Sequence, residues 1–153
     1  MIDQTIENIS VCEDISLITL HNLEGSAVGR AGILSAIAKK GINIDMISSS
    51  PDLGSAVNLS FSLSDADLPS ALEVISEFKK SFSELETSVC SGNIALSFFG
   101  IAMAAKPGVA AGVLCMLENS GIEVILITTS DVSISALVPG ADKVKVLRLT
   151  DDK

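Results

Sequence analysis

One acidic side chain interrupts an apolar segment in the first third of the chain. Asp45 follows Ile44 within residues 42–48, a stretch that otherwise has the character of an apolar strand. A carboxylate in such a place can accept charge-assisted hydrogen bonds from an ammonium group, each worth about 1.5–3 kcal/mol. The alternative is a charge on a solvent-facing strand position, where acidic residues usually lie. Asp45 is therefore a candidate for binding an ammonium group.

The start of the first predicted helix offers the complementary chemistry. Ser26, Gly29 and Arg30 lie there, where unpaired backbone N–H groups and the helix dipole favour a carboxylate. Helix capping with a solvated Arg30 explains the same residues equally well. This helix start is therefore a candidate for binding a carboxylate.

No other group of residues indicates catalysis or metal binding. His21 is the only histidine and no cysteine cluster accompanies it, so neither a metal site nor a histidine-based triad is expected. The segment Lys106-Pro107-Gly108 lacks the glycine spacing and the Lys-Ser/Thr pair of a phosphate loop. The sequence predicts no catalytic residue, no metal and no cofactor.

Composition and charge restrict the partners. The chain has 153 residues, of which 48% are hydrophobic, with 10 basic and 19 acidic residues and a net charge of −9. Nucleic acids and anionic membranes both require clustered basic residues, so neither is an expected partner. The longest apolar stretch, residues 98–105, is far short of the ~20 residues that span a bilayer. Three isolated cysteines (Cys12, Cys90 and Cys115) favour reduced thiols and a cytoplasmic location.

An internal repeat organises the chain. The block Ala31–Leu34 is similar to Ala111–Leu114, and Gly41–Ser50 is similar to Gly121–Ser130. Both pairs are offset by the same 80 positions (111 − 31 and 121 − 41). Two matches in one register indicate a duplication.

Each repeat follows the same order of predicted elements. A strand is followed by a glycine-containing loop, an amphipathic helix ending at a glycine, two more strands and a second helix. In the first repeat the strands are expected at 15–20, 42–48 and 57–63, and in the second at 94–99, 122–128 and 132–138. The first helix of each repeat has roughly three turns, with its apolar residues within 33–38 and 109–117, and the second helix of the first repeat has its apolar residues within 68–82. Residues 144–149 fit a strand and a helix about equally well.

Closing each sheet requires a fourth strand. Residues 85–89 can supply it in the first repeat, whereas the second has no strand left, so Thr5–Val11 is expected to complete it. The predicted fold class is α+β, with two ferredoxin-like βαββαβ domains, the first inserted into the second. The expected boundaries are 12–90 for the first domain and 91–153 plus 5–11 for the second.

Several segments resemble a known family. The residues Gly41–Ile47, Gly100–Met103, Lys106–Ala111, Gly121-Ile122 and Ile127–Ser130 are similar, in order, to the tandem ACT region of aspartate kinases. The resemblance implies feedback regulation through binding of a small amino acid such as lysine or threonine. It also implies a site near the loop after the first strand and the start of the second, at a contact between two ACT domains. A chain of this kind would be a small regulatory subunit or an excised region.

The resemblance adds site residues and shows departures. It carries over Leu23, Asn43, Ile44, Ser49 and Ser50 as ligand-binding positions, beside the candidates named above, although Ser49 and Ser50 could equally be turn residues before a proline. The kinase domain is absent. The first repeat has Ser26-Ala27-Val28-Gly29 where the family has a Pro-Gly, and the second has Ile125 where an acidic residue is frequent.

The expected function is amino-acid sensing without catalysis. Two alternatives are a structural ACT dimerisation module without a ligand and a small enzyme on a ferredoxin-like fold. The site is expected in the first repeat alone, because the second repeat has Ile125 in place of Asp45 and Ala110 in place of Arg30. The matching pocket of the second repeat should be filled by protein side chains or stay empty. A sheet covered on one face needs a neighbour, which predicts a homodimer. The family resemblance adds a separate kinase catalytic subunit as a further partner.

Overall fold

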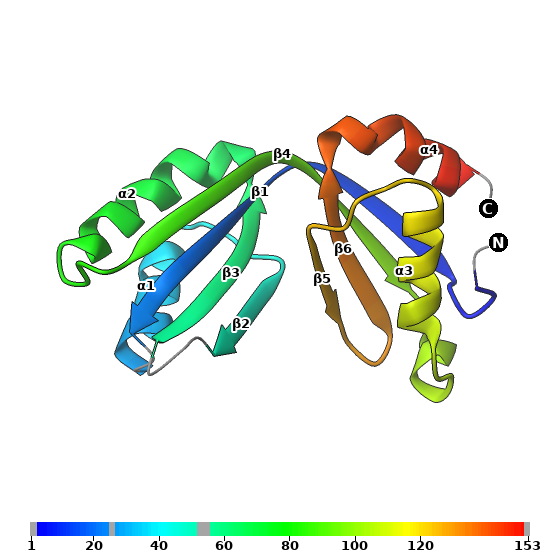
Figure 1. Ribbon diagram of the computed structural model, residues 1–153, viewed down its shortest axis with the longest axis horizontal. Helices are drawn as coiled ribbons and strands as arrows, with labels where there is room; N and C mark the ends of the chain where they lie inside the picture. The colour runs from blue at the N-terminus through cyan, green and yellow to red at the C-terminus, as the bar shows by residue number, and fades with distance from the viewer. Residues whose placement is uncertain (1–2, 25–26, 52–55, 152–153) are drawn as a thin grey trace. The chain divides into compact units, whose positions relative to one another are not determined.

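The computed structural model describes residues 3–24, 27–51 and 56–151 (Figure 1). Six strands and four α-helices, with three short 3-10 turns, make up this part of the chain. Its strands are β1 (Asn8–Glu24), β2 (Ile47–Pro51), β3 (Ala56–Ser64), β4 (Glu86–Phe99), β5 (Leu126–Thr129) and β6 (Ser133–Pro139). Its α-helices are α1 (Ala27–Lys39), α2 (Leu68–Lys79), α3 (Val109–Asn119) and α4 (Lys143–Asp151). None of the described helices is both long and apolar enough to cross a membrane.

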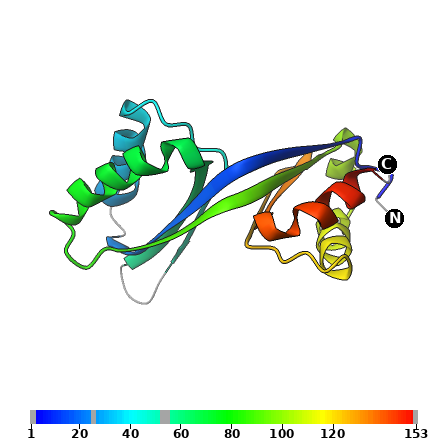
Figure 2. The same ribbon diagram turned by 90° about the horizontal axis from the view of Figure 1, so that it is seen from above.

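The contacts between residues divide the chain into two compact units. One unit is the continuous segment Ile15–Ser91, here called the inserted unit. The other, the split unit, combines Met1–Asp14 with Gly92–Lys153. The chain thus leaves the split unit along β1, builds the inserted unit and returns along β4. Figures 1 and 2 show these two long strands, blue and green, side by side.

The inserted unit has the strand order β2-β3-β1-β4. Strand β3 lies between β1 and β2 and is antiparallel to both. Alternate residues of β1 and β3 face helices α1 and α2, because successive side chains of a strand point to opposite faces. The resulting buried core contains Ile18, Leu20, Leu59, Phe61 and Leu63 from the strands and Ile33, Ile37, Ala71, Val74 and Ile75 from the helices.

The split unit repeats this plan with the order β1-β4-β6-β5. Strand β6 is antiparallel to both β4 and β5. Its core contains Ile94, Leu96 and Phe98 from β4, Ile134, Ala136 and Val138 from β6, Val109, Val113 and Leu117 from α3, and Val146 and Leu149 from α4. The predicted fold class, two ferredoxin-like domains with the first inserted into the second, is confirmed.

The long strands differ from the prediction. Separate strands were expected at 5–11 and 15–20, and again at 85–89 and 94–99, but one strand covers each pair. Strand β1 begins at Asn8, so residues 5–7 lie outside it. Asp14 in β1 and Gly92 in β4 adopt left-handed backbone conformations, with φ of 58° and 69°. Asp and Gly tolerate this region better than other residues, so each strand continues through this position without ending.

The second strand of each repeat begins later than predicted. Expected at 42–48 and 122–128, these strands run over Ile47–Pro51 and Leu126–Thr129. In the inserted unit the Ser62 hydroxyl accepts a hydrogen bond from the Met46 amide at 2.9 Å, while the Asp45 amide donates to the Ser62 carbonyl at 3.2 Å. A side chain thus replaces part of the regular ladder. Residues 144–149, which the sequence left open, belong to helix α4.

Candidate functional site

The candidate residues of the first repeat lie on three neighbouring segments of the inserted unit. These segments are the end of β1, the start of α1 and residues 43–50, which lead into and along β2. Ser26 lies outside the described residues. Leu23 is completely buried and belongs to the core, because the register of β1 against β3 shifts between Leu20 and Leu23. Leu23 can therefore form the floor of a site, but does not line its surface.

One polar contact joins two of these segments. The Arg30 guanidinium on α1 donates from Nη1 to the Ser49 Oγ on β2 over 3.4 Å. Arg30 is half-buried, Gly29 beside it is buried and Ser49 is exposed. A contact this long is weak, so the guanidinium is held near β2 without being strongly bound.

Residues 42–46 alternate between the core and the surface. Ile42 and Met46 are buried and Ile44 is half-buried, whereas the side chains of Asn43 and Asp45 are exposed. The Asp45 backbone is fixed through its hydrogen bond to β3, described above. The carboxylate therefore projects from a firmly held segment toward solvent.

Ser49 and Ser50 lie on opposite faces of β2. Ser49 is paired with Leu59, whose side chain is in the core, so Ser49 lies on the face that the helices cover. Ser50 is paired with Asn58 and lies on the other face. The structure thus associates Arg30 and Ser49 with each other and directs Ser50 away from them.

The equivalent positions of the second repeat carry no charge. Ala110 is half-buried against the core of the split unit. Ile125 is also half-buried, and its backbone N–H donates to the Leu137 carbonyl at 2.8 Å. Neither residue can pair with an ammonium or a carboxylate.

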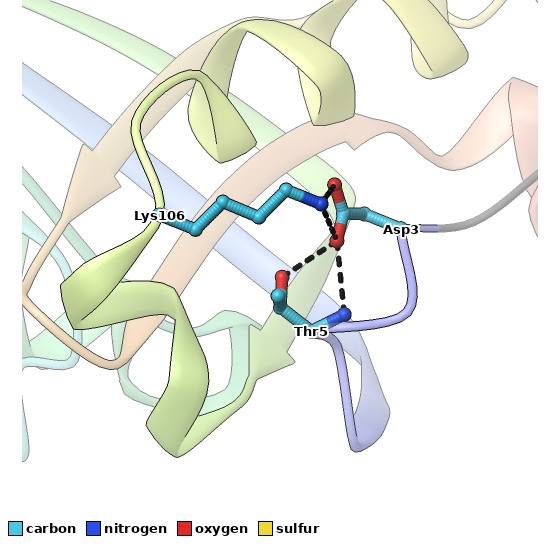
Figure 3. Close-up of polar contacts among 3 residues, drawn as sticks. All are labelled: Asp3, Thr5 and Lys106. Atoms are coloured by element: carbon cyan, nitrogen blue, oxygen red, sulfur yellow. Dashed lines mark hydrogen bonds and ion pairs between the residues drawn. The ribbon is translucent and has the colours of Figure 1, made fainter.

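The split unit contains a polar cluster that the sequence did not indicate (Figure 3). The Lys106 Nζ lies 2.8 and 3.0 Å from the two carboxylate oxygens of Asp3. The Thr5 hydroxyl and the Thr5 backbone N–H donate to the Asp3 Oδ1 at 2.7 and 2.9 Å. These contacts, that of Lys106 first, lower the pKa of Asp3 to about 2. Because 103 positions separate Asp3 from Lys106, no local pattern could reveal the pair.

Other features of the described residues point elsewhere. No group of three or more His, Cys, Asp or Glu side chains among them could hold a metal ion. A groove of about 680 Å³ lies between α1 and α2, and none of the candidate residues lines it; the lining residues are Ala36, Lys39, Lys40, Glu73, Val74, Ser76, Glu77 and Phe78.

The chain is similar in sequence to proteins of known family. Residues 96–152 match the family model of the ACT domain. An aspartokinase of Geobacillus stearothermophilus is 29% identical over 133 residues, which cover 87% of this chain and 32% of that protein. The chain thus spans about a third of the length of the curated relatives that it matches.

Solved structures share the whole fold. The regulatory subunit of aspartate kinase from Thermus thermophilus, in its ligand-free form, superimposes with a TM-score of 0.84 at 22% identity, covering 97% of this chain and 98% of that one. Aspartokinase III of E. coli, in complex with lysine and aspartate, gives a TM-score of 0.71 at 23% identity, covering 97% of this chain and 33% of that one. At these identities the likeness establishes a shared fold.

Proposed function

We propose that this chain, which resembles the tandem ACT-domain regulatory region of aspartate kinase, senses a small amino acid and transmits its presence to a catalytic partner. The observation that carries the proposal is the Arg30–Ser49 contact, since it brings a cation at the start of α1 against β2. The segment that enters β2 also carries the Asp45 carboxylate. One cation and one anion on adjoining segments suit the two charged ends of an amino acid.

In this proposal each charged end of the ligand has a defined partner. The ammonium of the ligand donates hydrogen bonds to Asp45, while its carboxylate accepts them from the Arg30 guanidinium beside Gly29. Arg30 gains by the exchange, because a carboxylate offers two charge-assisted bonds in place of one weak bond to a hydroxyl. Asn43, Ile44 and Ser49 border the ligand, Leu23 lies beneath it, and Ser26 completes the proposed positions. Ser50, on the other face of β2, supports the site without facing the ligand.

Lysine and threonine are the proposed effectors. Support comes from the resemblance to aspartate kinases and from the lysine in the E. coli aspartokinase III complex. We further propose that residues 12–90 form the first ACT domain, and that residues 91–153 with 5–11 form the second. Binding occurs in the first domain alone, because Ala110 and Ile125 give the second no charged anchor.

The proposed setting is a cytoplasmic homodimer that acts on a separate kinase catalytic subunit. The regulatory-subunit relative from Thermus thermophilus supports a separate catalytic chain. The exposed Ile47 on strand β2 supports a further contact there. A dimerisation module without a ligand is the competing function, and it is compatible with the same fold.

A thermal-shift screen with the twenty amino acids separates these two functions. A ligand that binds only the folded state raises the melting temperature, by an amount that grows with its concentration. We expect one or two amino acids, lysine or threonine among them, to stabilise the protein. If none shifts the melting temperature at millimolar concentration, the chain is a dimerisation module and the sensing proposal is wrong.

A further inference from the structure

Residues 3–7 form a strap that is built tightly into the split unit. The Glu7 backbone N–H donates to the Phe99 carbonyl at 2.8 Å, and the Glu7 side chain accepts the Ile101 backbone N–H at 3.1 Å. Ile6 is 4% exposed and belongs to the core. The Thr5 carbonyl lies so close to Gly100 that a Cβ there would stand 1.8 Å from the oxygen. These contacts hold the strap in place and thereby fix the position of Asp3.

The Asp3 carboxylate receives the set of donors that a bound carboxylate ligand would need. An ammonium (Lys106), a backbone N–H and a hydroxyl (both of Thr5) surround it with four contacts of 2.7–3.0 Å. The Asp3 side chain is only 25% exposed. Charge-assisted bonds of this length are the stronger class of hydrogen bond.

A small cleft adjoins this carboxylate. It has a volume of about 130 Å³ and is lined by Asp3, Ile6, Gly112, Val113 and Met116. Gly112 corresponds to Gly32 of the first repeat, but their surroundings differ. A Cβ on Gly32 would lie 3.3 Å from the Phe78 ring of α2, whereas a Cβ on Gly112 would meet nothing within 4 Å. In the inserted unit, helix α2 covers Gly32. In the split unit, the cleft beside Asp3 lies next to Gly112 instead.

We propose that Lys106 and Thr5 form a carboxylate-binding site in the split unit, next to the cleft beside α3, and that Asp3 of the same chain occupies this site as an internal ligand. The strap presents Asp3 to Lys106 and Thr5 at high effective concentration, because the carboxylate and the groups that bind it belong to one chain. External carboxylates are thereby kept out of this site. The site would accept a small monocarboxylate of the size of acetate once Asp3 is replaced by a smaller residue. This inference does not depend on amino-acid sensing by the inserted unit.

Chemical rescue tests the proposal. In Asp3→Ala the Lys106 ammonium and the Thr5 N–H lose their acceptor, so the melting temperature falls. Sodium acetate should restore much of that loss relative to sodium chloride at equal ionic strength. The effect should saturate, with a midpoint on the order of tens of millimolar, as expected for a few charge-assisted bonds to a small anion. The parent protein should respond to both salts alike.

Two further measurements make the test specific. Acetate should move the backbone amide resonance of Thr5 in Asp3→Ala and leave it unmoved in the parent. The double variant Asp3→Ala/Lys106→Met should show no saturable acetate response. Asp3→Ser, whose shorter side chain leaves room for acetate, provides the same test if the alanine variant folds poorly. An acetate response in Asp3→Ala that equals that of the parent or of the double variant would overturn the proposal.

Discussion

At the scale of single residues, the carboxyl group of Asp3 titrates in contact with a fixed cation. Its pKa falls from the ordinary value of 3.8 to about 2, chiefly through the Lys106 ammonium and then through the Thr5 backbone N–H. A depressed folded-state pKa stabilises the protein above the unfolded value, and this stability is lost as the pH falls through the folded value. The Asp3 contacts should therefore be fully effective near neutral pH and absent below about pH 2.

This titration gives the first prediction. The parent should be more stable than Asp3→Asn at about pH 6, and the difference should shrink progressively between about pH 4 and about pH 2. Urea unfolding at a series of pH values measures the difference. Lys106→Met removes the main cause of the pKa shift, so adding Asp3→Asn to it should change stability little at any pH. A difference between parent and Asp3→Asn that stays constant down to about pH 2 would contradict the assignment.

Asp45 and Ile125 provide the second prediction, because they occupy matching positions of the two repeats. Asp45→Ala should weaken amino-acid binding by about tenfold or more, as the loss of a charged hydrogen bond of ~1.5–3 kcal/mol implies. Ile125→Ala should leave the affinity nearly unchanged. Calorimetric titration of both variants with the effector decides between the repeats. If Asp45→Ala binds the effector like the parent and Ile125→Ala binds it more weakly, the site lies in the second repeat and not in the first.

At the scale of the elements, two glycines on matching helices lead to the third prediction. Gly112→Ala should stabilise the protein by about 1 kcal/mol, since alanine favours a helix interior and the new methyl group enters open space. Gly32→Ala should give a smaller gain or a loss, because the Phe78 ring at 3.3 Å must move. Midpoints of urea unfolding compare the two variants. Equal gains in stability for both variants would contradict the difference in packing around the two glycines.

The sequence predicted the elements whose pattern is local and missed those fixed by distant partners. The repeat and the apolar stripes of α1, α2 and α3 were sufficient for the helices and for the inserted topology. The late start of β2 was not predictable, because it depends on the Ser62 side chain. Helix α4 was ambiguous because four apolar residues fit two periods, and the structure resolves this by burying Val146 and Leu149 while exposing Val144 and Leu147. Gly100 gave no signal of its own, although its lack of a side chain admits the strap.

The candidate site was predictable to a smaller extent than the fold. The approach of Arg30 to Ser49 follows from the predicted order of elements, which sets α1 beside β2. The burial of Leu23 and the opposed directions of Ser49 and Ser50 follow from strand register, which the sequence alone did not determine. The resemblance supplied these positions from the family without their orientation. Only the structure separates the residues that can face a ligand from those that support the site.

At the scale of the whole molecule, the inserted arrangement makes the split unit depend on both ends of the chain. Residues 8–14 supply one of its four strands, and the strap before them adds Ile6 to its core. The three comparisons confirm the predicted resemblance to the ACT region of aspartate kinase. The split unit can complete its fold only after the inserted unit has been synthesised, because 77 residues (15 to 91) separate its two segments.

The last prediction concerns self-association. Strand β2 ends the strand order of the inserted unit, and its Ile47 is 47% exposed. An edge strand with an exposed apolar side chain can pair with another chain, so we expect a homodimer at tens of micromolar that buries Ile47. Burial of such a side chain contributes about 1.5–3 kcal/mol, and Ile47→Lys should therefore raise the dissociation constant by about tenfold or more. Val144→Lys is the matched control, because Val144 is also apolar and β-branched and is more exposed, at 61%, but lies on α4. Light scattering across a concentration series measures both variants. A monomeric parent, or a dimer that Val144→Lys weakens and Ile47→Lys does not, would exclude β2 as the contact.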